Sequence, residues 1–131
     1  MEKPIGKEEL LRMADGFGCA LCDHPFESDP DIAVLRRKDN RKWFGICFCV
    51  PRRTFGGGDG SELALNVKCD PALSHMLCET YAVVAPGYHM NKRYWISVRL
   101  DGSVPRAEVA QLLRLSCDIV APKPRAHVKN K

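Results

Sequence analysis

The sequence has no long apolar run and no export signal. No stretch approaches the roughly 18 consecutive apolar residues that a membrane-spanning helix requires, and the N-terminus has no charged segment followed by an apolar one. There is no internal repeat, and the glycine-rich stretch at residues 56–61 lacks the Gly-Lys-Ser/Thr ending of a phosphate-binding loop. We therefore expect a soluble cytoplasmic protein with no membrane partner.

Cysteine is present, but disulfides are not expected. The seven cysteines are an odd number and are scattered over the chain, which is typical of a reducing compartment. A chain of 131 residues has the length of one domain. We predict a monomer with a single domain over residues 1–122 and a basic, flexible tail over residues 123–131.

Apolar residues recur with the period of a strand in some segments and with that of a helix in others. Asp70 is predicted to cap one helix and Ser103 another. The helices come first, between and last around the strands, which indicates an α+β two-layer sandwich, an antiparallel sheet with helices packed on one face. The predicted strands are residues 32–35, 43–50, 63–69 and 94–100, and the predicted helices begin at residues 7, 71 and 105.

The other face of this sheet is predicted to stay open. In the strand at 43–50, alternation puts Phe44, Ile46 and Phe48 on one side and Trp43 and Cys47 on the other. The same count along the remaining strands predicts an open face made of Trp43, Cys47, Asn66, Lys68, Trp95, Ser97 and Arg99.

Charge is unevenly distributed along the chain. Residues 32–55 carry seven basic and one acidic side chain, whereas residues 1–31 carry three basic and eight acidic ones. Basic side chains in hairpin loops can follow phosphates and release counterions, and they also occur simply as solvated turns that protect sheet edges. The two basic loops consist of Arg36, Arg37, Lys38, Arg41 and Lys42, and of Arg52 and Arg53.

Residues 66–120 resemble the MmcQ/YjbR family of small, mostly bacterial proteins. The resemblance rests on the Lys-Cys-Asp-Pro run at 68–71, the Pro-Gly-Tyr-His-Met-Asn-Lys run at 86–92, Trp95, and the Leu-Asp-Gly-Ser-Val-Pro run at 100–105. It implies a CyaY-like (frataxin-like) fold with projecting hairpins in a double-wing arrangement. It also implies a suggested DNA-binding role and an otherwise largely unassigned activity.

Arg106 and Cys117 depart from the family pattern, which more often has an acid and a tyrosine at these positions. A positive side chain in the first turn of a helix opposes the helix dipole by about 0.3–1 kcal/mol. We expect Arg106 to make this helix end attractive to an anion, and Cys117 to be a change in packing.

The leading hypothesis is a non-enzymatic module that binds DNA through the two basic loops. The alternative is a protein-interaction or small-molecule surface on the open sheet face, because aromatic side chains beside cations can stack bases or anchor a partner. The candidate residues of this second surface are Lys68, Tyr88, His89, Asn91, Lys92, Trp95 and Arg99. The alternative for Trp95 is that a loop or the C-terminal tail covers it.

Catalytic and metal chemistry have weaker signals. Cys69 with His89 is a minor enzyme hypothesis, since a cysteine nucleophile needs a nearby base, but Cys69 sits at a strand end and nothing orients the histidine. Cys19 and Cys22 have the spacing of a redox pair and of metal ligands, with His24 close by. A thioredoxin-type pair, however, lies between a strand and the start of a helix, whereas this one follows a helix, and a closed zinc site needs a fourth ligand. We predict no catalytic residues, no metal site and no cofactor.

Overall fold

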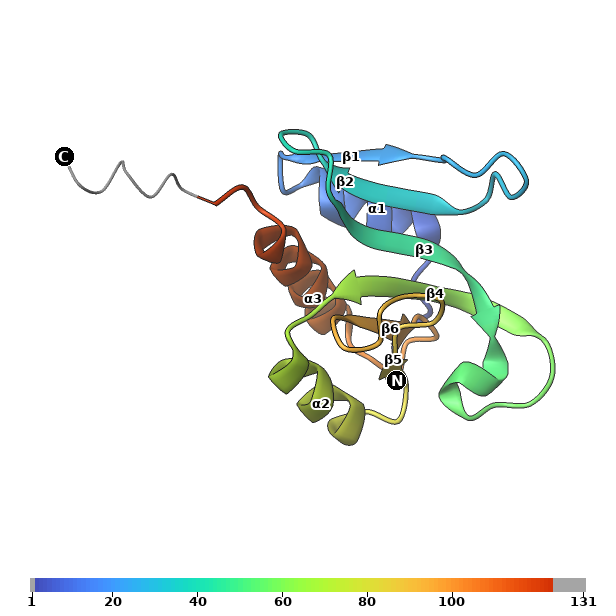
Figure 1. Ribbon diagram of the computed structural model, residues 1–131. Coiled ribbons are helices and arrows are strands. Elements are labelled where there is room, and N and C mark those ends of the chain that lie inside the picture. The colour runs from blue at the N-terminus through green and yellow to red at the C-terminus, as the bar shows by residue number, and fades with distance from the viewer. Residues whose placement is uncertain (1, 124–131) are drawn as a thin grey trace.

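Residues 2–123 are described by a computed structural model (Figure 1), and of the predicted tail only Lys123 falls in this range. Over these residues the chain forms six strands, three α-helices and one short 3-10 helix. None of these helices combines the length and the apolar character that crossing a bilayer would require. In chain order the elements are α1 (Lys7–Asp15), β1 (Ala20–Asp23), β2 (Ala33–Arg37), β3 (Trp43–Pro51), η1 (Arg52–Phe55), β4 (Ser61–Lys68), α2 (Pro71–Thr80), β5 (Val84–Pro86), β6 (Trp95–Arg99) and α3 (Arg106–Ile119).

The strands form one antiparallel sheet in the order β1-β2-β3-β4-β6-β5. Helices α1 and α3 pack on one face, which we call the inner face, and α2 lies beside β5 (Figure 1). The main core lies between this face and the helices, where Leu65, Val67, Ile96 and Val98 are buried together with Leu113 of α3. The predicted α+β architecture is confirmed, as is the alternation predicted for β4 and β6.

A β-bulge interrupts the pairing of β2 with β3. Leu35 pairs with Gly45, but the next residue of β2, Arg36, pairs with Trp43. Phe44 is therefore an extra residue in β3, because a bulge places two residues of one strand opposite one residue of its partner.

The bulge reverses the alternation predicted for β3. Phe44 and Cys47 both pack in the inner core, whereas Trp43, Ile46 and Phe48 gather on the opposite face, which we call the outer face. The predictions that Cys47 lies on the open face, and that Ile46 and Phe48 point away from Trp43, are wrong. A two-residue count fails here because the inserted residue shifts every later side chain to the other face.

Ser116 of α3 pairs two backbone groups at the end of the β3–β4 ladder. Its hydroxyl donates to the carbonyl oxygen of Phe44 at 2.6 Å and accepts from the amide of Lys68 at 2.8 Å. The last residue pair between β3 and β4 at this end is Gly45 with Val67, so these two groups lie just beyond the ladder. Buried backbone groups need partners, and this contact holds α3 in a defined position on the sheet.

One of the two predicted helix caps is present in the structure. Asp70 accepts two hydrogen bonds from amides in the first turn of α2, which confirms the predicted cap. Ser103 does not cap α3, because the helix begins at Arg106 with Pro105 at the cap position.

Strands β1 and β5 were not predicted. Both are short edge strands, so pairing with a neighbour defines them more than their own pattern does.

Arg106 is held by the N-terminal segment. Its guanidinium donates to the Glu9 carboxylate, with one of the two contacts at 2.8 Å, and to the carbonyl oxygens of Lys3 and Pro4. Its amide donates to the carboxylate of Glu2 at 2.8 Å. The anionic groups at this helix end are therefore the chain's own carboxylates, which balance the positive charge of Arg106.

Candidate functional site

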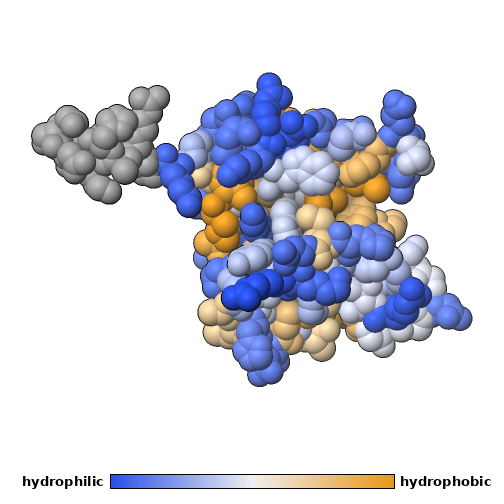
Figure 2. All heavy atoms as spheres, viewed as in Figure 1, coloured by the Kyte–Doolittle hydropathy of each residue, from blue (hydrophilic) through white to orange (hydrophobic). Residues whose placement is uncertain are grey.

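The outer face of the sheet carries an apolar cleft of about 310 Å³. Strand β3 contributes to its floor, and the β1–β2 and β5–β6 loops contribute to its walls. Figure 2 shows apolar surface exposed between the upper strands and the lower part of the molecule, with polar side chains around it. We call this hollow the aromatic cleft, and it is lined by Phe26, Ile32, Trp43, Ile46, Phe48, Tyr88, His89 and Met90.

The rings of the cleft contact one another in two groups. Phe26 packs edge-on against Trp43, with ring centroids 6.0 Å apart and an interplanar angle of 86°. Phe48 lies 6.3 Å from the ring of Tyr88, which in turn lies 4.0 Å from the ring of His89. Such edge-to-face and tilted pairs are favourable arrangements for aromatic side chains. Each group presents ring surface to the same hollow.

A buried polar cluster fixes the backbone of Tyr88. Asn66 of β4 donates through Nδ2 to the carbonyl oxygen of Tyr88 at 3.0 Å. Ser97 of β6 accepts from the amide of Tyr88 at 2.9 Å and donates to Oδ1 of Asn66 at 2.5 Å. Asn66 and Ser97 are cross-strand partners and both are fully buried. The two backbone polar groups of Tyr88 are thus paired with the sheet itself.

Gly87 lets the β5–β6 loop approach the sheet closely. Its amide donates to the carbonyl oxygen of Trp95 at 2.8 Å, and a Cβ added at Gly87 would lie only 2.7 Å from Cβ of Trp95. The next-but-one residue, His89, has a φ of 60°, an uncommon backbone conformation for a non-glycine residue. The loop is therefore shaped to lie over β6.

Trp95 is covered by this arrangement. Only 8% of its surface is exposed, and it packs with Val34 and Ile46 beneath Met90. The prediction that Trp95 is an exposed stacking residue of the open face is wrong. A two-residue count identifies the correct side of the strand, but it cannot show that a loop from elsewhere in the chain covers that side.

Other residues of the predicted surface make ion pairs or hydrogen bonds outside the cleft. Arg99 pairs with Glu62 at 2.6 Å and with Asp101 at 3.3 Å. Lys92 donates to the carbonyl oxygen of Gly87, and Asn91 accepts from a backbone amide within the same loop. The structure brings Tyr88 and His89 together in the cleft, whereas its lining does not include Lys68, Asn91, Lys92, Trp95 or Arg99.

The first basic loop is partly neutralised by neighbouring groups. Arg36 donates to Asp23 at 2.7 Å. Arg37 donates to both carboxylate oxygens of Asp39 and to the carbonyl oxygen of Cys117 near the end of α3, where a cation is favoured by the helix dipole. No carboxylate within residues 2–123 pairs with the other three cations of this loop, Lys38, Arg41 and Lys42.

The two basic loops lie at opposite ends of β3. The first ends where the strand begins at Trp43, and Arg52 and Arg53 follow directly where it ends at Pro51. A strand of nine residues separates them by roughly 27 Å, at about 3.3 Å per residue. Figure 1 shows the two connections at different edges of the molecule.

Cys69 and His89 do not form a reactive pair. Cys69 is buried in the inner core, where burial raises the pKa of its thiol to about 11, while His89 is exposed on the outer face. Burial likewise raises the pKa of Cys47 to about 12 and that of Cys117 to about 11. No group of three or more His, Cys, Asp or Glu side chains in the described part of the chain could hold a metal ion.

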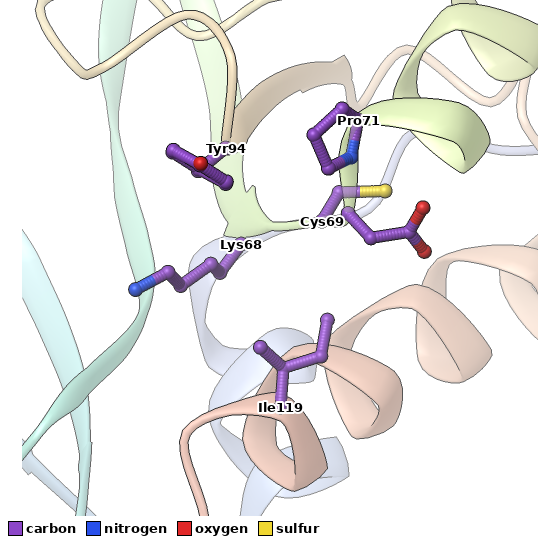
Figure 3. A pocket seen from close by; sticks show the side chains of 6 residues that line it. Lys68, Cys69, Pro71, Tyr94 and Ile119 are labelled. Atoms are coloured by element: carbon purple, nitrogen blue, oxygen red, sulfur yellow. The ribbon is translucent and has the colours of Figure 1, made fainter.

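A second hollow, of about 340 Å³, lies between the end of β4, the start of α2 and the end of α3. Figure 3 shows that Lys68 extends away from the sulfur of Cys69, with Tyr94 on one side and Ile119 on the other. Its side chains do not converge on a common point. Ligand sites usually combine an apolar pocket with a few convergent polar groups, so the aromatic cleft is the better candidate.

Sequence reasoning named Trp43, Tyr88 and His89 but missed most of the cleft. Phe26 and Ile32 lie in or beside a segment read only as a polar loop, and nothing in their sequence neighbourhood indicates a ligand. Phe48 and Ile46 were placed on the wrong face because of the bulge. The run at residues 86–92, picked out by the family resemblance, was the one usable signal.

Comparison with known proteins identifies similar sequences. A family model described as YjbR matches residues 18–118. The uncharacterized protein YyaQ of Bacillus subtilis is 38% identical over 95 residues, which cover 72% of this chain and 80% of YyaQ. The uncharacterized protein YjbR of Escherichia coli K12 is 36% identical over 53 residues, which cover 40% of this chain and 45% of that protein.

Solved structures share the fold. A crystal structure of a Pseudomonas syringae protein superposes with a TM-score of 0.81 at 30% identity, covering 89% of this chain and 100% of that chain. The crystal structure of DR2400 from Deinococcus radiodurans gives a TM-score of 0.70 at 26% identity, covering 94% of this chain and 85% of that chain.

Proposed function

We propose that this chain, which belongs to the YjbR family, is a non-enzymatic binding module that holds a planar aromatic group in the aromatic cleft. The observation that carries the proposal is the gathering of aromatic side chains from three separate segments around one open apolar hollow. Ligand pockets are typically lined by apolar and aromatic side chains. A binding role accounts for this surface.

The lining of the cleft suggests the chemical class of the ligand. It contains no Lys, Arg, Asp or Glu, so recognition would rest on ring stacking and burial of apolar surface. Stacking of one ring on an aromatic side chain contributes about 1–3 kcal/mol. A volume of about 310 Å³ lies at the lower end of the roughly 300–1,000 Å³ range of ligand pockets. The fit is to one or two fused rings with little net charge.

Duplex DNA binding by two wings, the leading hypothesis from the sequence, has weaker support. It requires both basic loops to reach one duplex from the same side, whereas they lie at opposite ends of β3. Arg36 and Arg37 are also engaged with Asp23 and Asp39. The aromatic cleft therefore has more structural support as a binding site than the two basic loops have.

A chemical-shift titration of the isotopically labelled protein tests the proposal. Phenol and indole serve as aromatic probes, and cyclohexanol serves as the non-aromatic counterpart of phenol. We expect the aromatic probes to shift amides around Trp43, Phe48 and Tyr88, with dissociation constants of about 1 mM or tighter. Cyclohexanol should bind at least about fivefold more weakly, because it cannot stack.

Substitutions locate the binding site. Trp43→Ala and Phe48→Ala each remove part of the floor of the cleft and should weaken indole binding at least about fivefold. Tyr94→Ala is the matched control, since Tyr94 is an exposed aromatic residue outside the cleft, and it should leave the affinity unchanged. Equal binding of phenol and cyclohexanol, or shifts confined to the helices, would refute the proposal.

A further inference from the structure

Two thiols lie in contact at the corner where β1, the β2–β3 turn and α3 meet. The Sγ atoms of Cys19 and Cys117 are 3.4 Å apart, although the two residues are 98 positions apart in the sequence. Cys19 precedes β1 and is half-buried, whereas Cys117 lies near the end of α3 and is fully buried. All seven cysteines lie within the described residues as free thiols, and this is the one Sγ–Sγ contact recorded there.

Several contacts hold this pair in place. Nη1 of Arg37 lies 3.2 Å from Sγ of Cys117 and donates to its carbonyl oxygen at 3.1 Å. The amide of Lys38 donates to the carbonyl oxygen of Cys19 at 2.8 Å. The same turn is tied to α3 by Asn40, whose Nδ2 donates to the carbonyl oxygen of Val120 at 2.8 Å. Both sulfurs are therefore attached to a braced part of the fold.

We propose that Cys19 and Cys117 are a redox-modification site and form a reversible intramolecular disulfide when the protein meets a low-molecular-weight disulfide such as oxidised glutathione. The sulfurs must approach from 3.4 Å to about 2.05 Å. A shift of this size lies within the reach of side-chain rotation and a small displacement of the turn before β1.

The reaction proceeds by two exchanges. The thiolate of Cys19, the more exposed partner, attacks one sulfur of oxidised glutathione, whose S–S bond breaks and releases one glutathione thiolate. The thiolate of Cys117 then attacks Sγ of Cys19 and displaces the second glutathione. The two protons lost by the protein thiols are taken up by the two glutathione thiolates, so the protein is oxidised by two electrons and the reagent is reduced by two.

The guanidinium of Arg37 has a specific part in the second exchange. That step requires negative charge on Sγ of Cys117. Burial raises the pKa of this thiol, and the adjacent guanidinium acts against that rise because a cation beside a thiol stabilises its thiolate. The other thiols lack this arrangement. Cys22 and Cys49 are exposed, but no second sulfur contacts either of them in the described structure. A small disulfide should convert these two into mixed disulfides and link only the pair at the corner.

The link would have a structural consequence. It would join the edge strand β1 to α3 across most of the chain, and a cross-link that closes a long loop stabilises by restricting the unfolded state. We expect the melting temperature to rise by about 5 °C or more on oxidation and to return on reduction with dithiothreitol. This inference stands apart from the proposed ligand cleft, which lies on the other face of the sheet.

The test uses the full chain, reduced and then incubated with oxidised glutathione. Free thiols are blocked, the protein is digested without reduction, and linked peptides are identified by mass spectrometry. We expect a peptide pair joining Cys19 to Cys117, lighter by two hydrogen atoms than the sum of its parts. Cys22→Ser is the matched control, because this exposed thiol is close to Cys19 in the chain, and it should leave the link unchanged.

Cys117→Ala and Cys19→Ser should each abolish the link and the rise in melting temperature. Since Cys117 is fully buried, its substitution can impair folding, and Cys19→Ser with the peptide map of the unaltered protein then decides the matter. Only mixed disulfides with glutathione, or links between other cysteines, would overturn the proposal. The Arg37→Gln variant should form the link more slowly, at least about threefold.

Discussion

The side-chain amide of Asn66 donates a hydrogen bond of 3.0 Å to the backbone carbonyl oxygen of Tyr88. Asn66 is fully buried in the middle of the sheet, whereas Tyr88 lies in the β5–β6 loop that walls the aromatic cleft. The bond therefore links the rigid floor of the molecule to the wall of its candidate site. A site positioned in advance by its supporting residues loses less free energy of ordering when a ligand binds.

Removal of this link should cost stability and binding together. In Asn66→Ala the carbonyl oxygen of Tyr88 loses its side-chain donor, and the hydroxyl of Ser97 loses the acceptor for its proton while it still accepts from the amide of Tyr88. We expect the free energy of unfolding to fall by about 1–3 kcal/mol in urea denaturation followed by circular dichroism, with weaker binding of indole. Gln111→Ala, an exposed change on α3, should stay within about 0.5 kcal/mol of the parent. Equal stability of both variants would contradict this account.

Because Gly87 lies so close to β6, we predict that any side chain at position 87 destabilises the fold. A Cβ there would lie 2.7 Å from Cβ of Trp95 and 3.0 Å from its carbonyl oxygen, so in Gly87→Ala the loop must move away from the sheet. We expect a loss of about 1–3 kcal/mol in the free energy of unfolding and altered amide shifts at Tyr88. Gly58→Ala is the matched control, because nothing lies within 4 Å of a Cβ at that position.

The salt dependence of DNA affinity shows whether one basic loop or both loops contact the phosphates. If duplex DNA binds only through Lys38, Arg41 and Lys42, the slope of log affinity against log salt should be roughly −3, at about −0.9 per phosphate contacted. We expect this shallow slope in anisotropy titrations, because the second loop lies at the other end of β3. The double variant Arg52→Ala with Arg53→Ala should then leave it unchanged. A slope steeper than about −5 that this variant flattens would restore the two-wing hypothesis.

The pairing of Arg106 with Glu9 predicts an acid-sensitive contribution to stability. Hydrogen bonding to Arg106 lowers the pKa of the Glu9 carboxyl below its usual 4.5 in the folded state. A carboxyl with a depressed folded pKa stabilises the fold above its unfolded pKa, and this contribution disappears as pH falls through the folded value. We therefore expect the free energy of unfolding to decrease as pH falls below 4.5, as measured by urea denaturation.

Substitution of the arginine isolates this pair from other carboxyls. Arg106→Gln should be less stable than the parent at neutral pH and should lose less stability on acidification. Arg114→Gln is the control, since the contact of Arg114 with Asp118 is longer, at 3.6 Å, and exposed. An acid response of Arg106→Gln as steep as that of the parent would show that other groups govern the effect.

Local signals in the sequence were sufficient for a large part of the fold. The alternation of Leu65 with Asn66 and of Ile96 with Ser97 placed both strands correctly, and Asp70 with Pro71 marked the start of α2. These features depend on near neighbours in the chain, because strand periodicity and helix capping act over a few residues. The sequence also places the basic loops along the chain, but it does not determine how they lie relative to each other.

The tertiary structure decided the rest, and with it the candidate site. The bulge at Phe44 lies in the pairing of β3 with β2, and the carbonyl oxygen of Phe44 accepts from the hydroxyl of Ser116, which comes from a helix far along the chain. The covering of Trp95 and the meeting of Phe26 with Trp43 depend on where loops come to rest on the sheet. The sequence alone determined the α+β layout, since this layout follows from the periodicity of residues that are close together in the chain. The cleft and the thiol pair arise only when segments distant in the chain are packed together.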